Sequence, residues 1–161
     1  MKARLKFFGQ LALYWLLFFT VSRILFFIYL YDQTSTLTAK EIGKPMILGM
    51  RMDAAMTGYW LLIPGLIFVA SAFMSSKWVT VLQGFITSLL LFISSLLVVA
   101  DLELYKHWGF RINATPLMYL ESEAASSVNP TILVVLMIIF VVLLIAFMLL
   151  YWKVLAPQLS S

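Results

Sequence analysis

Four long apolar runs constrain the fold of this chain more than any other feature. They cover residues 7–31, 46–73, 78–100 and 131–152. A helix of about 20 apolar residues crosses the hydrocarbon core of a bilayer, and each run reaches that length. Thr38 and Glu41 fit a capping box, which predicts a short separate helix before the second run. The sequence therefore predicts an all-α, polytopic membrane protein with four transmembrane helices in one domain.

Composition supports this class and excludes several others. The 161 residues are 63% hydrophobic and 11% charged, whereas a soluble domain has about 45–50% apolar and about 25% charged residues. The absence of cysteine excludes disulfides, thiolate nucleophiles and cysteine metal sites. The net charge of +4 comes from scattered basic residues without a basic patch, so we expect no nucleic acid partner.

Basic residues near the ends of the apolar runs predict the orientation. One side of the membrane would carry basic residues and no acid: Lys2, Arg4, Lys6, Lys77 and Lys153. The other side would mix four basic residues with six acidic ones in longer loops. Because basic loops stay in the cytoplasm, we expect both termini inside, in the cytoplasmic membrane of the cell. Residues 101–129 would then form an interfacial segment on the outer face, between the third and fourth helices.

Charged residues inside the apolar runs mark the candidate site. Arg51 and Asp53 lie in the second run about 10 Å below its outer end, and Arg23 lies at a similar depth in the first. Charged side chains at bilayer depth are costly and commonly functional. Asp101 and Glu103 close the third run at the same face. We therefore expect these five residues to converge at the outer leaflet.

The expected pairing follows from helix geometry. Arg51 and Asp53 point about 200° apart, so they cannot share one partner. The natural arrangement pairs Asp53 with Arg23 and leaves Arg51 facing Asp101 or Glu103. Two interpretations stay open: the cluster fixes helix register while arginines snorkel to headgroups, or an arginine binds a lipid phosphate through two hydrogen bonds.

No catalytic centre is recognisable in the sequence. The single histidine, His107, has no cluster of carboxylates or cysteines with which it could bind a metal. No serine or threonine has a plausible base partner for nucleophilic catalysis. We therefore predict no catalytic residue, metal or other cofactor in this chain.

Two motifs resemble a known family. Residues 49–53 read Gly-x-Arg-x-Asp, and residues 101–111 begin Asp-x-Glu and end Gly-Phe-Arg at Arg111. With residues 113–120, they resemble the N-terminal membrane domain of lipoteichoic acid synthase-like proteins, and most closely the Bacteroidetes branch. These proteins are phosphoglycerol transferases with a sulfatase-type catalytic domain of the alkaline phosphatase superfamily. The resemblance covers essentially the whole chain and places Arg111 in the candidate cluster.

The resemblance implies a membrane anchor that presents anionic lipid, such as phosphatidylglycerol, from the outer leaflet. Family members continue into a fifth span and an extracellular domain that holds a divalent metal and a threonine nucleophile. The sequence printed here ends at Ser161, so no catalytic residue transfers, and the catalytic domain would act in cis or in trans. Two alternatives remain: a small transporter or channel subunit that uses the intramembrane charges, and a purely structural anchor.

Overall fold

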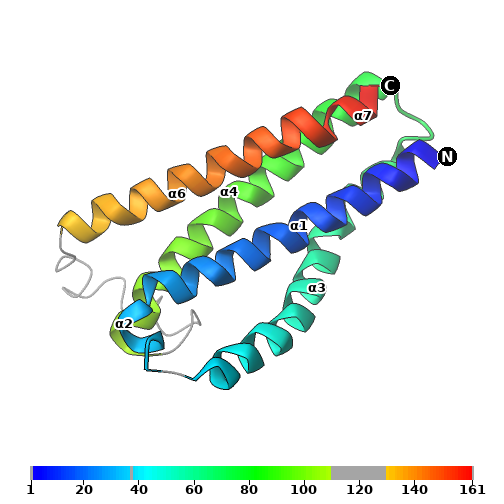
Figure 1. The fold of residues 1–161 in the computed structure, drawn as a ribbon. Helices are drawn as coiled ribbons and strands as arrows, with labels where there is room; N and C mark the ends of the chain where they lie inside the picture. The colour runs from blue at the N-terminus through cyan, green and yellow to red at the C-terminus, as the bar shows by residue number, and fades with distance from the viewer. Residues whose placement is uncertain (1, 37, 110–129, 161) are drawn as a thin grey trace.

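The protein is all-α, and its four long helices alternate in direction along the chain. The computed structural model describes residues 2–36, 38–109 and 130–160. The elements are α1 (Lys2–Tyr29), α2 (Tyr31–Thr34), α3 (Ala39–Ala70), α4 (Ser76–Trp108), α6 (Pro130–Leu150), the π-helix η2 (Tyr151–Leu155) and α7 (Pro157–Ser160). Both chain ends lie at one end of the bundle, which we call the terminal end (Figure 1). The opposite end, where α1 ends, α3 begins and α4 ends, we call the α2 end.

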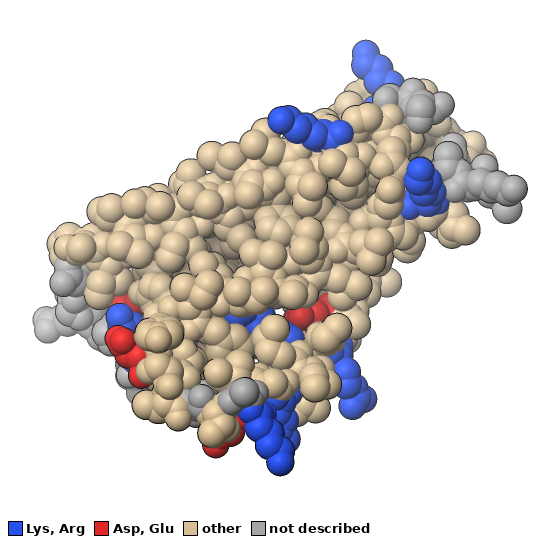
Figure 2. Space-filling view, viewed as in Figure 1, with Lys and Arg blue, Asp and Glu red and all other residues tan. Residues whose placement is uncertain are grey.

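The four long helices give the molecule a wide uncharged belt. Candidate membrane spans run over Leu5–Tyr29, Lys40–Ala70, Ser76–Lys106 and Pro130–Leu159. In Figure 2 the charged side chains gather toward the two ends, and the terminal end shows Lys and Arg without Asp or Glu in this view. Such a belt faces lipid without cost, because lipid tails are as apolar as the side chains. The chain is a multi-pass membrane protein, as the sequence predicts.

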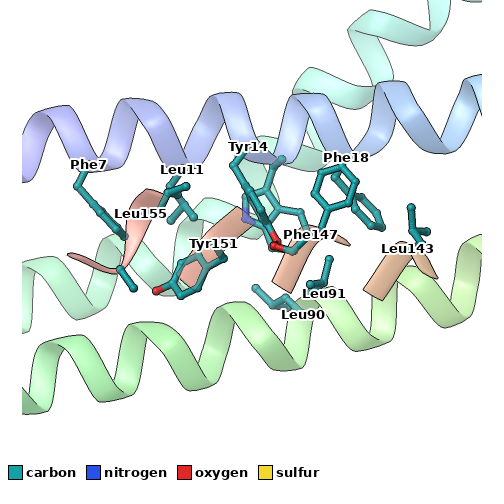
Figure 3. Packing of buried hydrophobic residues seen from close by; sticks show 12 residues of the cluster. Phe7, Leu11, Tyr14, Phe18, Leu90, Leu91, Leu143, Phe147, Tyr151 and Leu155 are labelled. Atoms are coloured by element: carbon teal, nitrogen blue, oxygen red, sulfur yellow. The ribbon is translucent and has the colours of Figure 1, made fainter. Parts of the chain in front are cut away.

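The main apolar core extends from the terminal end to the middle of the bundle, and Figure 3 shows its side chains. Aromatic side chains of α1 project into it and meet α4, α6 and η2; the buried ones are Phe7, Tyr14, Trp15 and Phe18. Phe18 packs edge-to-face on Phe147, with ring centroids 5.0 Å apart. The Tyr14 hydroxyl donates a hydrogen bond of 3.2 Å to the Phe147 carbonyl. Tight aromatic packing of this kind is a main source of helix association in lipid.

The last helix continues beyond its predicted end at residue 152. After α6 the chain widens into η2, where the Ala156 N–H donates to the Tyr151 carbonyl, five residues back, at 3.0 Å. The Tyr14 hydroxyl uses the carbonyl of Phe147 at the end of α6, and a side chain that competes for a helix carbonyl is a common companion of such irregular turns. The hydrogen-bond register of the last helix therefore shifts by one residue close to its contact with α1.

The predicted short helix before the second span does not form. Instead α3 begins at Ala39 and runs without a break through Pro45 and Pro64 to Ala70. The Glu41 carboxylate accepts hydrogen bonds from the Thr38 N–H (2.8 Å) and hydroxyl (2.7 Å). The capping box at Thr38 was predicted correctly. The helix that it caps is the whole of α3 and not a short separate helix.

The third long helix continues past the predicted start of the interfacial segment at residue 101. Residues 101–108 continue α4, and the helix ends at Gly109. Gly109 has φ +71 and donates its N–H to the Tyr105 carbonyl at 2.9 Å. A left-handed glycine is a common helix terminator, since it lacks the Cβ that would clash there. The rest of the predicted segment, residues 110–129, lies outside the described residues.

Candidate functional site: the polar contacts at the α2 end

The Arg23–Asp53 ion pair joins α1 to α3, as the sequence predicts. Arg23 Nη2 lies 2.6 Å from Asp53 Oδ1, and Nη1 donates to the Met46 carbonyl at 2.9 Å. Each of the two side chains is only 12% exposed. A buried guanidinium with both a carboxylate and a carbonyl partner has its charge and its hydrogen bonds satisfied together. The pair therefore fixes the register of α1 against α3.

Gly49 gives the guanidinium the space that it needs. Gly49 and Asp53 are four residues apart on α3, so they lie on one face, and that face meets Arg23. A Cβ added at Gly49 would overlap the guanidinium carbon and both of its terminal nitrogens. The structure thus explains the first position of the Gly-x-Arg-x-Asp motif. Sequence reasoning overlooked Gly49, although its spacing of four from a buried acid was a usable signal.

Arg51 lies on the other side of α3. Its side chain is exposed, while that of Asp53 is buried. Within the described part of the chain, no ion pair joins Arg51 to Asp101 or Glu103, so the expected pairing is not formed. The reason is the angular offset of about 200° between residues two apart. Because Asp53 turns inward to Arg23, Arg51 must turn away from the bundle.

A second polar contact joins the end of α1 to the end of α4. The Tyr29 hydroxyl donates to Glu103 Oε2 at 2.6 Å, and the Lys106 ammonium lies 5.4 Å from the centroid of the Tyr29 ring. Phe26 and Tyr105 pack edge-to-face beside them, with centroids 4.9 Å apart. The sequence analysis did not identify Tyr29 as the partner of Glu103. Asp101 is half-buried in the same turns of α4.

The six predicted site residues therefore separate into different surroundings. Arg23 and Asp53 form the α1–α3 ion pair, and Glu103 belongs to the α1–α4 contact. Arg51 is exposed on α3, and Asp101 lies half-buried on α4. Arg111 lies outside the described residues. The five described residues all lie toward the α2 end, as predicted, but they form separate contacts and not one site.

An open groove lies beside the ion pair. Its volume is about 530 Å³, and it separates the end of α1 and α2 from the first turns of α3. Its walls are mostly apolar, with Ile24 and Phe27 on one side and Ile42 and Met46 on the other; Thr34 and Ser35 lie at its rim. Met46 belongs both to the wall and, through its carbonyl, to the bonds of Arg23. The groove lies at the end of the bundle where α3 diverges from α1, as the ribbon in Figure 1 shows.

Polar side chains also line the inner face of α4. Trp60 Nε1 donates to Ser94 Oγ at 2.9 Å, and Gln83 Nε2 donates to the Pro64 carbonyl at 2.8 Å. Thr87 is buried on the same face, and Ser95 is buried on an adjacent side of α4. Hydrogen bonds of this type between helices stabilise membrane proteins by about 0.6 kcal/mol on average. These residues were missed because an isolated Ser, Thr or Gln hardly lowers the hydropathy of a long apolar run.

The chemistry available at the α2 end is the binding of anions. In residues 2–36, 38–109 and 130–160, no group of three or more His, Cys, Asp or Glu side chains could hold a metal ion. Arg51 provides a guanidinium with free access, and Lys40 and Lys44 are exposed on the same helix. A guanidinium binds phosphate through two parallel hydrogen bonds.

Comparison with known proteins gives no further assignment, since no protein-family model, curated protein or solved structure matches the chain.

Proposed function

We propose that this chain is a membrane-anchoring domain that binds anionic lipid at its α2 end, for a lipoteichoic acid synthase-like enzyme. The catalytic domain, of the sulfatase type with a divalent metal, would act in cis or in trans. The observation that carries the proposal is Arg51, an exposed cation on an apolar spanning helix. A charge in that position is costly unless it reaches water or an anionic partner. Lipid phosphates are the anions that surround such a helix.

The proposal places the α2 end at the outer leaflet of the cytoplasmic membrane. Its support is that the end with both termini (Figure 1) displays Lys and Arg without Asp or Glu in the view of Figure 2, because positively charged loops favour the cytoplasm. Single cysteines at Ser35 and Ser76, both exposed at opposite ends, allow a test. We expect a membrane-impermeant thiol reagent to label position 35 and spare position 76 in intact cells. The reverse pattern would overturn the orientation.

The lipid role is tested with Arg51→Lys. Lysine keeps the charge but loses the planar, two-pronged geometry that matches phosphate, and an exposed position should tolerate it without loss of stability. We expect weaker binding of phosphatidylglycerol and unchanged unfolding. In the full enzyme, turnover of lipid should fall while turnover of a soluble phosphodiester stays normal. Equal losses on both substrates, or on neither, would reduce Arg51 to a structural residue.

A small transporter or channel subunit is the second candidate, and one observation favours it. The buried polar face of α4 includes Gln83, Thr87 and Ser94 and extends along the inside of the bundle. Polar residues inside spanning helices often mark ion or proton paths. Proteoliposomes loaded with a pH-sensitive dye would decide: a proton flux that Thr87→Val abolishes supports conduction, and no flux above empty liposomes removes this candidate.

A further inference from the structure

Three cations form a stripe on the exposed face of α3. Lys40, Lys44 and Arg51 are spaced by four and seven residues, so they fall within about 40° around the helix axis. All three are exposed. Figure 2 shows Lys and Arg side chains projecting from the part of the molecule where α3 begins. We call these three residues the basic stripe.

The two acids of α3 are engaged by other partners, although Glu41 lies three residues before Lys44 on the helix surface. Glu41 accepts both of its hydrogen bonds from Thr38, and Asp53 binds Arg23 on the opposite face. Among the described residues, no ion pair engages any member of the stripe. Lys40 also lies in the first turn of α3, where the helix dipole disfavours a cation. The fold thus leaves three positive charges available to an anion from outside the chain.

The spacing decides how many anionic groups the stripe can take. Lys44 and Arg51 are separated by about 10 Å along the helix. Side chains on a helix lean toward its N-terminus, so both cationic groups move by a similar amount toward the α2 end and stay apart. To share one phosphate with Arg51, Lys44 would have to turn back toward the bilayer centre, against its preference for water. Two separate anionic groups match this arrangement better than one.

We propose that the basic stripe binds a lipid headgroup that carries two anionic groups, a phosphate at Arg51 and a second group farther from the bilayer centre at Lys44. This inference rests on the proposed function, because it names the class of headgroup that the same end of the molecule would bind. Ile47 and Leu48 lie between the two cations and are 70% and 54% exposed. They leave apolar surface beside the stripe for the lipid's glycerol and first methylene groups.

The test compares two lipids that differ by one outer phosphate. The purified chain in detergent micelles is titrated with phosphatidylinositol and with phosphatidylinositol 4-phosphate, and bound lipid is measured by mass spectrometry of the intact complex. We expect the second lipid to bind about tenfold more tightly, the gain of one charge-assisted contact. Lys44→Gln should abolish this preference and leave phosphatidylinositol binding within about twofold, since a distant exposed charge contributes little.

Lys77→Gln is the matched control, because Lys77 is exposed at the terminal end. It should leave the preference intact. Equal affinities for the two lipids would overturn the inference, as would the same loss of preference in Lys77→Gln and Lys44→Gln. If the lipids bind equally but Arg51→Lys weakens both, the proposed function stands and only the two-anion headgroup fails. If Arg51→Lys changes neither, both fail.

Discussion

The terminal-end half of the bundle and the α2-end half use different kinds of contact. From the terminal end to the middle of the bundle, rings of α1 from Phe7 to Phe18 fill space between α1, α4 and α6 (Figure 3). Near the α2 end, α1 is joined to α3 by the Arg23–Asp53 ion pair and to α4 by the Tyr29–Glu103 hydrogen bond. Packing of apolar rings depends on volume and tolerates adjustment, whereas ion pairs require defined partners at defined distances. We therefore expect the α2 end to respond more sharply to small chemical changes.

Asp53→Ala should have the largest effect on stability. It leaves the buried Arg23 guanidinium without its carboxylate, at a cost of about 3 kcal/mol. Arg23→Met in the same chain should recover part of this loss, because it removes the stranded charge. A double-mutant cycle of unfolding in mixed micelles gives the coupling. Coupling near zero would mean that the ion pair does not hold α1 to α3.

Gly49→Ala should cost about 2 kcal/mol, since the added methyl displaces the guanidinium from its carboxylate. Gly58→Ala on the same helix is the control: nothing lies within 4 Å of a Cβ there. That variant should be neutral or stabilised by about 0.5–1 kcal/mol, because alanine is the better helix former. The same unfolding assay compares them. Similar values for the two variants would remove Gly49 from the site.

Phe18→Ala should cost about 1–2 kcal/mol. Removing the ring leaves a cavity in the core, and the lost packing contacts lower the free energy of unfolding. The second contribution known from soluble proteins, the transfer of the ring out of water, is absent because the unfolded helices remain in lipid. Leu17→Ala is the control, because Leu17 immediately precedes Phe18 on α1 and is 48% exposed. A cost for Phe18→Ala well above that of Gly49→Ala would contradict the comparison between the two halves.

Tyr29→Phe should have the smallest effect, about 0.6 kcal/mol, the typical contribution of a hydrogen bond between helices in a membrane. The ring remains, so the contacts with Lys106 and with the end of α4 should persist. Unfolding of Tyr29→Phe together with Glu103→Gln would show whether the two changes are coupled. Additive losses would mean that this bond does not join α1 to α4.

Several contacts of the site could be predicted from the sequence. The predictions that were wrong or missing share one physical cause. The pairing of Asp53 with Arg23 followed from matching depths on two antiparallel helices and the angular offset from Arg51. The partner of Glu103 did not follow, because depth alone cannot choose between Arg51, Lys106 and a tyrosine hydroxyl. The spacing of four between Gly49 and Asp53 was a usable signal that both residues share one face of α3. It does not indicate which neighbouring side chain fills the space at the glycine.

The sequence by itself determined the class and the four spans, and it predicts the depth of each charge, because hydropathy and a rise of 1.5 Å per residue suffice for these. Only the tertiary structure decided which face each charge presents: Asp53 turns in against Gly49 and Arg23, while Lys40, Lys44 and Arg51 stay outside. The physical reason is that depth is a property of one helix, whereas partnership depends on how two helices are rotated against each other. That rotation is set by packing across the whole bundle.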